Sequence, residues 1–216
     1  ALQALARAAG VPLELRLRRG PELHAEILDE ARALAARGAV LLVIRRRGRR
    51  GLLANLLVGE MVSKVLAQAP CSVLVVAREA RLWQRAVLAG IDPQHRDPTL
   101  PAAAAALARE CGAKLHLVCV AANEAQRAAA EQALAQARAD SGEPAAGGEV
   151  RIGVAHAELM AAAVGCAADL LVLGRRGEPG GRALARARLG SVAREVTGLA
   201  TCPVLVHIPP AVEPLR

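Results

Sequence analysis

Hydrophobic and polar residues along this chain fall into patterns that are typical of particular elements. Short apolar runs such as 170–173 (LLVL), bounded by Asp169 and Gly174, are typical of strands that are buried on both faces. Longer stretches such as 21–37 have apolar residues three or four positions apart, which predicts amphipathic helices. In segment 11–17, leucines alternate with charged residues, which predicts a half-buried strand.

These patterns divide the chain into strands and helices that follow one another in turn. The expected strands are 11–17, 40–44, 71–76, 86–91, 115–120, 150–154, 170–173 and 204–206. The expected helices are 1–9, 21–37, 59–69, 101–110, 124–139, 157–167 and the stretch that opens at Gly190-Ser191. Strands separated by helices predict an α/β fold with parallel sheets and helices on both faces. In such a sheet the ligand crevice lies outside the carboxyl ends of the strands.

An internal repeat indicates that the chain contains two copies of one α/β unit. Gly59–Val76 lies over Gly190–His207 without a gap, at a constant offset of 131 residues. Strand 41–44 lies over 170–173 at an offset of 129. The second copy has a strand–helix–strand before its matching region, whereas the first copy has only a helix before residue 11. We therefore expect that about one strand–helix–strand segment is absent from the first copy.

The repeat also sets the expected domain organisation. The expected boundaries are 1–80 for the N-terminally incomplete first copy, 81–85 for a linker that contains the sole Trp83, and 86–210 for the second copy. The last strands of the two copies, 71–76 and 203–207, would each leave an apolar edge exposed. We expect these strands to pair with each other within the chain, so that the two copies form a pseudo-dimer. A further homodimer of whole chains stays open.

The stretch from Asp169 to His207 combines a strand, a glycine-rich loop, a helix and a second strand. A glycine loop before a helix start lets the backbone approach a phosphate, and the free N–H groups of the helix start favour an anion. This stretch resembles the universal stress protein family. The family hallmark is Gly, two residues, Gly, nine residues and Gly-Ser or Gly-Thr, with a Cys-Pro-Val-Leu-Val strand after the helix. Gly190-Ser191 and the segment 202–206 (CPVLV) match the last two parts.

The glycine spacing admits two registers. Gly174 follows the strand directly and pairs with Gly177, but the twelve residues 178–189 then precede Gly190. Gly177 with Gly180 leaves nine residues before Gly190, but the first glycine then lies three residues beyond the strand end. We favour Gly174 and Gly177 with a three-residue loop insertion, because the first glycine should follow the strand directly.

The resemblance implies two tandem Rossmann-like units, of the adenine nucleotide alpha hydrolase-like type, and a site for ATP with Mg²⁺ as a possible companion. In family members that bind ATP, an Asp after the first strand lies beside the adenine and ribose. A Val at the end of the second strand contacts adenine, and the glycine loop with the Ser or Thr holds the phosphates. The residues expected to bind the nucleotide here are Asp92, Val120, Gly174, Arg176, Gly177, Gly190, Ser191 and Val192. Arg175 is a further candidate to face the triphosphate charge.

The first copy departs from the family pattern. Arg45 stands where the strand-end glycine belongs, and Glu60 replaces the Ser that follows Gly59. A carboxylate at a helix start satisfies the helix dipole itself and repels a phosphate. We therefore expect no ATP in the first copy, which would then serve as a structural or regulatory half.

Composition narrows the function classes. A net charge of +8, from 28 basic and 20 acidic residues, fits either a solvated surface or an anion-binding protein. The chain has no Phe or Tyr on which bases could stack, so a nucleic-acid partner is not expected. Five cysteines without a C-x-x-C pair predict reduced thiols rather than disulfides or a zinc site. The absence of a leader pattern and of a membrane-length apolar run predicts a cytoplasmic protein.

Two alternatives to plain ATP binding remain at this stage. The chain could be a universal stress protein that binds no nucleotide and acts through protein–protein interaction, as some family members do. It could instead be a weak nucleotide hydrolase, although Ser191 has no evident base partner and the five histidines are scattered. A P-loop enzyme is not expected, because the G-x-x-x-x-G-K-[ST] motif is missing.

Overall fold

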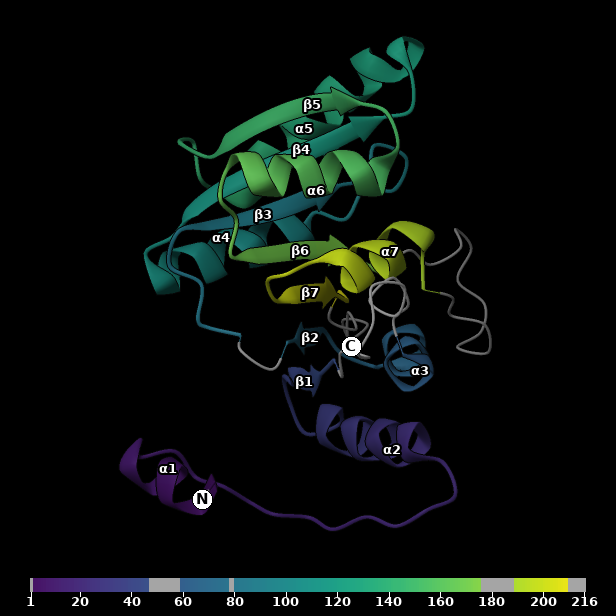
Figure 1. Ribbon diagram of the computed structural model, residues 1–216. Helices are drawn as coiled ribbons and strands as arrows, with labels where there is room; N and C mark the ends of the chain where they lie inside the picture. Colours follow the sequence, from purple (N-terminus) through teal and green to yellow (C-terminus); the bar gives the residue numbers. More distant parts are fainter. Residues whose placement is uncertain (1, 47–58, 78–79, 176–188, 210–216) are drawn as a thin grey trace, which may run out of the picture.

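The computed structural model describes residues 2–46, 59–77, 80–175 and 189–209, and their seven strands form one sheet (Figure 1). The strands are β1 (Leu42–Arg45), β2 (Val73–Val76), β3 (Ala86–Ile91), β4 (Lys114–Ala121), β5 (Gly147–Ile152), β6 (Leu170–Gly174) and β7 (Val204–His207). The helices are α1 (Leu2–Ala8), α2 (Leu23–Ala35), α3 (Glu60–Gln68), α4 (Thr99–Cys111), α5 (Arg127–Ser141), α6 (Ala155–Gly165) and α7 (Ser191–Leu199). The strand order is β1-β2-β7-β6-β3-β4-β5, and every pair is parallel except β2 with β7. The predicted α/β class is confirmed.

Helices cover both faces of the sheet, and each face has its own apolar core. In Figure 1, α6 and α7 lie in front of the sheet and α4 and α5 lie behind it. Successive strand residues point to opposite faces, so Leu88 of β3 packs in the core with α6 and α7. Its neighbours Val87 and Ala89 pack in the core with α4 and α5. This two-sided burial explains why β3 is a continuous apolar run rather than an alternating one.

The two copies meet at the antiparallel pair of β2 and β7, as the sequence predicted. Leu74 lies directly opposite Leu205 in this pair. These two leucines also occupy the same position of the internal repeat, at the offset of 131. A residue that faces its own counterpart marks a two-fold axis, so the copies are related by a pseudo-two-fold axis through this pair.

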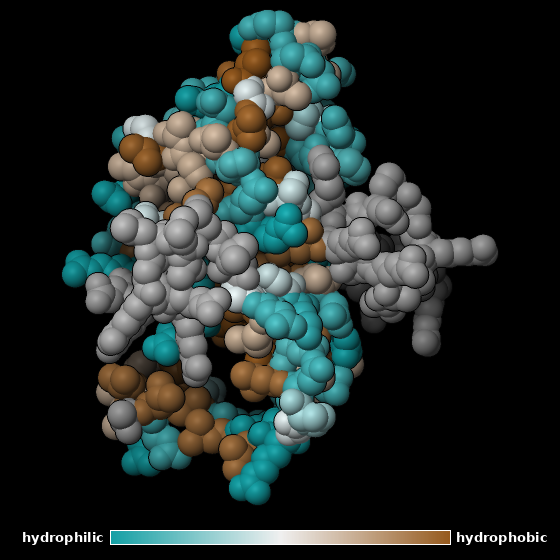
Figure 2. Space-filling view, turned by 45° about the vertical axis from the view of Figure 1, so that its right-hand side comes forward, coloured by the Kyte–Doolittle hydropathy of each residue, from teal (hydrophilic) through white to brown (hydrophobic). Residues whose placement is uncertain are grey.

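The predicted strand at Val11–Leu17 is wrong. This segment is not part of the sheet and lies beside α2, where Arg16 contacts Glu30 at 2.5 Å and Arg18 contacts Glu26 at 2.9 Å. Its leucines point outward instead, with Leu13, Leu15 and Leu17 exposed to 45%, 61% and 85%. Apolar side chains (brown) also gather at the lower end of the molecule in Figure 2, which holds the N-terminal elements in Figure 1.

The order of the strands in the sheet explains why segment 11–17 does not form a strand. The repeat places this segment over β5, which pairs with β4 in the second copy. Among the described residues of the first copy, no strand corresponds to β4, and β1 pairs only with β2. An alternating pattern forms a strand only where a neighbour supplies hydrogen bonds.

Strand β5 begins earlier than its sequence predicted. Gly147 and Gly148 lie before the expected strand 150–154, but they pair with His116 and Leu117 of β4. A Cβ atom on Gly147 would lie 2.5 Å from Nδ1 of His116, which is closer than side chains approach in proteins. A side chain at position 147 would thus force the His116 ring to move, so close packing rather than a turn favours glycine here.

Asp169, just before β6, binds the backbone at the start of β3 and in the two residues before it. Its carboxylate accepts hydrogen bonds from the backbone N–H groups of Gln84 (2.9 Å), Arg85 (3.0 Å) and Ala86 (3.1 Å). Burial alone would raise the pKa of Asp169, but the three N–H donors together outweigh it, and the pKa is lowered from its ordinary value of 3.8. A lowered pKa in the folded state means that the charged form stabilises the fold.

We expect Asp169→Ala to lower the free energy of unfolding by about 1–3 kcal/mol at pH 7, because three backbone donors lose their acceptor. The folded pKa is depressed, so this contribution is complete above the unfolded value near 3.8 and is lost as the pH falls through the folded pKa. Urea denaturation at pH 7 and at pH 3 measures the difference. Asp29→Ala, at a side chain that is 56% exposed, is the control. An equal effect of Asp169→Ala at both pH values would contradict this prediction.

Candidate functional site

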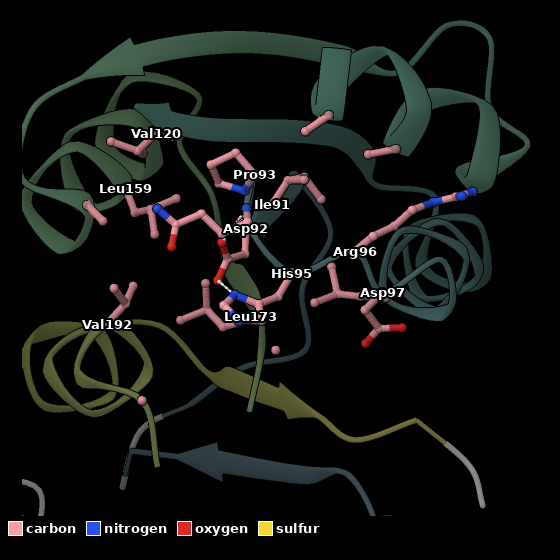
Figure 3. A pocket seen from close by; sticks show the side chains of 18 of the residues that line it. Ile91, Asp92, Pro93, His95, Arg96, Asp97, Val120, Leu159, Leu173 and Val192 are labelled. Carbon is pink, nitrogen blue, oxygen red and sulfur yellow. Dashed lines mark hydrogen bonds and ion pairs between the residues drawn. The ribbon is translucent and has the colours of Figure 1, made fainter. Parts of the chain in front are cut away.

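A cavity of about 1060 Å³ lies at the carboxyl ends of β3, β4 and β6 (Figure 3). Residues from β4, β6, the segment after β3 and the start of α7 meet around it. The lining includes six of the eight residues expected to bind a nucleotide, namely Asp92, Val120, Gly174, Gly190, Ser191 and Val192. Arg176 and Gly177 lie outside the described residues. The fold therefore brings the six together, while their roles as ligands stay predictions.

One wall of the cavity is apolar. Val120 at the end of β4, Leu159 of α6, Leu173 of β6 and Val192 of α7 line it, and Figure 3 shows these side chains around the same space. Three different elements besides β4 thus supply aliphatic surface of the kind that packs on a planar ring. Leu159 was not predicted from the sequence, because α6 is apolar on most of its faces and its pattern does not indicate which residues line a cavity.

Asp92 follows β3 directly and projects a carboxylate into the cavity. Its Oδ1 accepts a hydrogen bond from the backbone N–H of Gln94 at 2.9 Å. Its Oδ2 lies 3.3 Å from Nδ1 of His95, the contact drawn as a dashed line in Figure 3. The turn at Pro93 and these contacts fix the direction of the carboxylate. His95 also lines the cavity, a position that the sequence analysis did not identify.

The far side of the cavity is formed by α5. Gln132 and Gln136 line it together with alanines of the same helix, and Gln126 lines it from the short turn just before α5. Arg96 reaches from the segment after β3 to Asp140 near the end of α5, with Nη2 and Oδ1 3.2 Å apart. The sequence predicted only an alanine-rich helix here. Which of its side chains line the cavity depends on how the segment after β3 packs against the helix, and this packing cannot be read from the sequence.

The start of α7 presents backbone donors to the cavity. Ser191 is the first residue of α7, Gly190 precedes it, and the first turn contains no acidic residue. The first N–H groups of a helix have no partner within the helix, so they favour an anion. Helix α3 of the first copy differs, because Glu60 is its first residue and pairs with Lys64 at 2.9 Å. The hydrogen bond from Lys64 lowers the pKa of Glu60, which stays charged.

Arg175 does not direct its charge toward a phosphate, in contrast to the sequence-based expectation. The residue lines the cavity, but its Nη1 donates hydrogen bonds to the carbonyls of Ala67 (3.2 Å) and Ala69 (2.7 Å) of the first copy. Its guanidinium group is thus committed to the carboxyl end of α3. Among the described residues of the cavity, the start of α7 still offers backbone N–H groups that could face an anion.

The fold and the sequence are similar to those of known proteins. The family model described as Universal stress protein family matches residues 1–77 and 84–207. A protein from Pseudomonas aeruginosa UCBPP-PA14, described as a universal stress protein, is 22% identical with a TM-score of 0.76, and the match covers 95% of this chain and 76% of that one. A protein of unknown function from P. aeruginosa PAO1 is also 22% identical with a TM-score of 0.76, over 95% and 75% of the two chains.

A third solved structure has the same fold. A universal stress protein from Archaeoglobus fulgidus DSM 4304 is 20% identical with a TM-score of 0.65, over 98% of this chain and 76% of that one. No curated protein matches the chain. Within the described part of the chain, no helix has the length and apolar character needed to cross a membrane.

Proposed function

This chain belongs to the universal stress protein family, and we propose that its second copy binds ATP or a related adenine nucleotide in the cavity at the carboxyl ends of β3, β4 and β6. One observation carries this proposal. Six residues assigned to a nucleotide from the family resemblance, far apart in the sequence, line a single cavity. Its volume of about 1060 Å³ is ample for a nucleotide.

The lining fits the chemistry of a nucleoside. An adenine ring is planar and apolar on its faces, and Val120, Leu159 and Val192 offer aliphatic surface for it. A ribose carries hydroxyl donors, and the carboxylate of Asp92 is an acceptor held in place by its contacts with Gln94 and His95.

The phosphate end of the nucleotide belongs at the start of α7. Gly190 has no side chain to block a close approach, and the N–H groups that follow have no partner within the helix, so they can donate to phosphate oxygens. The described residues contain no group of three His, Cys, Asp or Glu side chains that could hold a metal ion. Any Mg²⁺ that accompanies ATP would then be bound mainly through phosphate oxygens and water, as is usual for this ion.

The first copy is not expected to bind a nucleotide. Glu60 occupies the position of Ser191, so that a carboxylate follows Gly59 at the start of α3 where a hydroxyl follows Gly190 at the start of α7. Two unit charges at ~4 Å repel by about 4 kcal/mol in a dielectric of intermediate strength. We therefore assign one nucleotide to each chain.

Isothermal titration calorimetry of nucleotide-free protein with ATP, adenosine and tripolyphosphate tests the proposal. ATP should bind, and each fragment should bind at least about tenfold more weakly, because it contacts only one end of the cavity. Asp92→Ala should weaken ATP binding by about tenfold through the lost ribose contact, with Asp29→Ala as a control outside the cavity. No heat of binding at millimolar ATP would contradict the proposal and would favour the alternative, a family member that acts through protein–protein interaction.

A further inference from the structure

Two arginines at equivalent positions of the repeat reach across the pseudo-two-fold axis. Arg46 follows β1 and Arg175 follows β6, at the offset of 129 that relates these strands. Arg46 donates from Nη1 to the carbonyls of Thr197 (2.8 Å) and Gly198, and from Nη2 to that of Ala200 (2.8 Å). Arg46 therefore binds the carboxyl end of α7, in the other copy.

Arg175 makes the reciprocal contact with α3. Its acceptors Ala67 and Ala69 are the repeat counterparts of Gly198 and Ala200, at the offset of 131. The backbone of each arginine is anchored as well. The N–H of Arg46 donates to Val76 (2.8 Å), and the N–H of Arg175 donates to His207 (3.1 Å). We call these two arginines with their carbonyl acceptors the arginine exchange.

The contacts are chemically well matched. The last carbonyls of a helix have no partner within the helix and carry the negative end of its dipole. A guanidinium group supplies both the missing hydrogen-bond donors and a positive charge. Both cations are partly withdrawn from water, and this burial lowers the pKa of Arg46 and of Arg175. Such a desolvated cation holds its geometry more firmly than a surface ion pair does.

Both ends of the arginine exchange adjoin elements of the cavity. The carbonyls held by Arg46 belong to residues six to nine positions after Ser191, so about 9 to 14 Å along the helix axis separates them from the cavity end of α7. Arg175 directly follows Gly174, which also lines the cavity. The first copy thus holds the helix that presents the phosphate-binding N–H groups, and it holds the strand end beside them.

We propose that Arg46 is a positioning residue for the cavity of the opposite copy. The first copy, which lacks a nucleotide site of its own, fixes the orientation of α7 through Arg46, and Arg175 fixes the strand end at Gly174. This inference rests on the proposed function, because it concerns the same cavity. The first copy would then have a structural role, because it keeps the N–H groups at the start of α7 oriented toward the phosphates.

The test compares Arg46→Ala with Asp169→Ala. Both variants remove hydrogen bonds to backbone groups, but Asp169 lies at the amino end of β6, whereas Gly174 and the cavity lie at its carboxyl end. ATP affinity is measured by calorimetry at a temperature where urea curves show that both variants are folded. Arg46→Ala should weaken ATP binding by at least about tenfold, whereas Asp169→Ala should change it by less than about twofold. Arg46→Lys should recover part of the affinity, because an ammonium group can donate to the same carbonyls.

An Arg46→Ala variant that binds ATP within about twofold of the unchanged chain would overturn the inference. If the unchanged chain binds no ATP, the proposed function fails, and the positioning role is then tested without ligand. In that case Arg46→Ala should shift the backbone amide resonances of Val192 and Ala193, at the cavity end of α7, and Asp169→Ala should not. Unshifted resonances in Arg46→Ala would overturn the positioning role independently of any nucleotide.

Discussion

Replacing Ser191 by glutamate should abolish ATP binding while the fold is retained. A carboxylate at the first position of α7 would lie where the phosphates are expected, at the cavity edge. A repulsion of about 4 kcal/mol corresponds to a loss of roughly a thousandfold in affinity. The same carboxylate is favourable for the helix itself, because it interacts with the positive end of the helix dipole. The first copy already carries this arrangement at Glu60, which starts α3 without disturbing it.

Ser191→Gln is the matched control, because glutamine has the size of glutamate without its charge. Calorimetry should show a moderate loss of affinity for Ser191→Gln and no binding for Ser191→Glu, and circular dichroism should show similar folded spectra for both. Equal losses in the two variants would show that steric exclusion rather than charge is responsible. ATP binding to Ser191→Glu within about tenfold of the unchanged chain would show that the phosphates lie elsewhere.

Replacing Leu205 by aspartate should destabilise the whole chain by about 3 kcal/mol or more, because it buries an unpaired charge at the pseudo-two-fold axis. Leu205 is 5% exposed and faces Leu74, which is 8% exposed, in the pair that joins the two copies. Leu82→Asp introduces the same group at a side chain that is 64% exposed. Urea denaturation followed by circular dichroism measures both.

The shape of the unfolding curve is informative as well. A single transition whose midpoint falls strongly in Leu205→Asp and stays nearly constant in Leu82→Asp is expected, because the sheet is continuous through β2 and β7. A stability loss below about 1 kcal/mol in Leu205→Asp would show that this pairing contributes little to the folded state.

The elements that the sequence predicted well are those whose pattern is complete in itself. The segment 202–206 reads as a buried strand after a helix, and it is β7 after α7 in the structure. The ungapped offset of 131 related β2 to β7, and this relation correctly predicted their pairing. The strand predicted at 11–17 was wrong, because an alternating pattern is typical of a strand but does not reveal whether a neighbouring strand exists. The inclusion of Gly147 in β5 was not predicted, because its close approach to His116 is apparent only when the register of β4 and β5 is known.

Some residues of the candidate site were likewise predicted from the sequence, and others were not. Asp92, Val120 and Ser191 were assigned to the site from the family resemblance, and the carboxyl ends of parallel strands and the start of a helix bring them to one cavity. Leu159 and the glutamines of α5 were not identified, because which face of a helix lines a cavity depends on tertiary packing. The direction of Arg175 was likewise beyond the sequence, since its acceptors belong to α3, more than a hundred positions away in the chain. The domain boundaries at 81–85 stay a prediction.

A count of bound ATP per chain by native mass spectrometry tests most directly whether the second copy holds the single nucleotide site. At saturating ATP we expect one nucleotide on the unchanged chain and none on Ser191→Glu. Two bound nucleotides would contradict the assignment of the first copy as degenerate. A chain that carries none would contradict nucleotide binding itself.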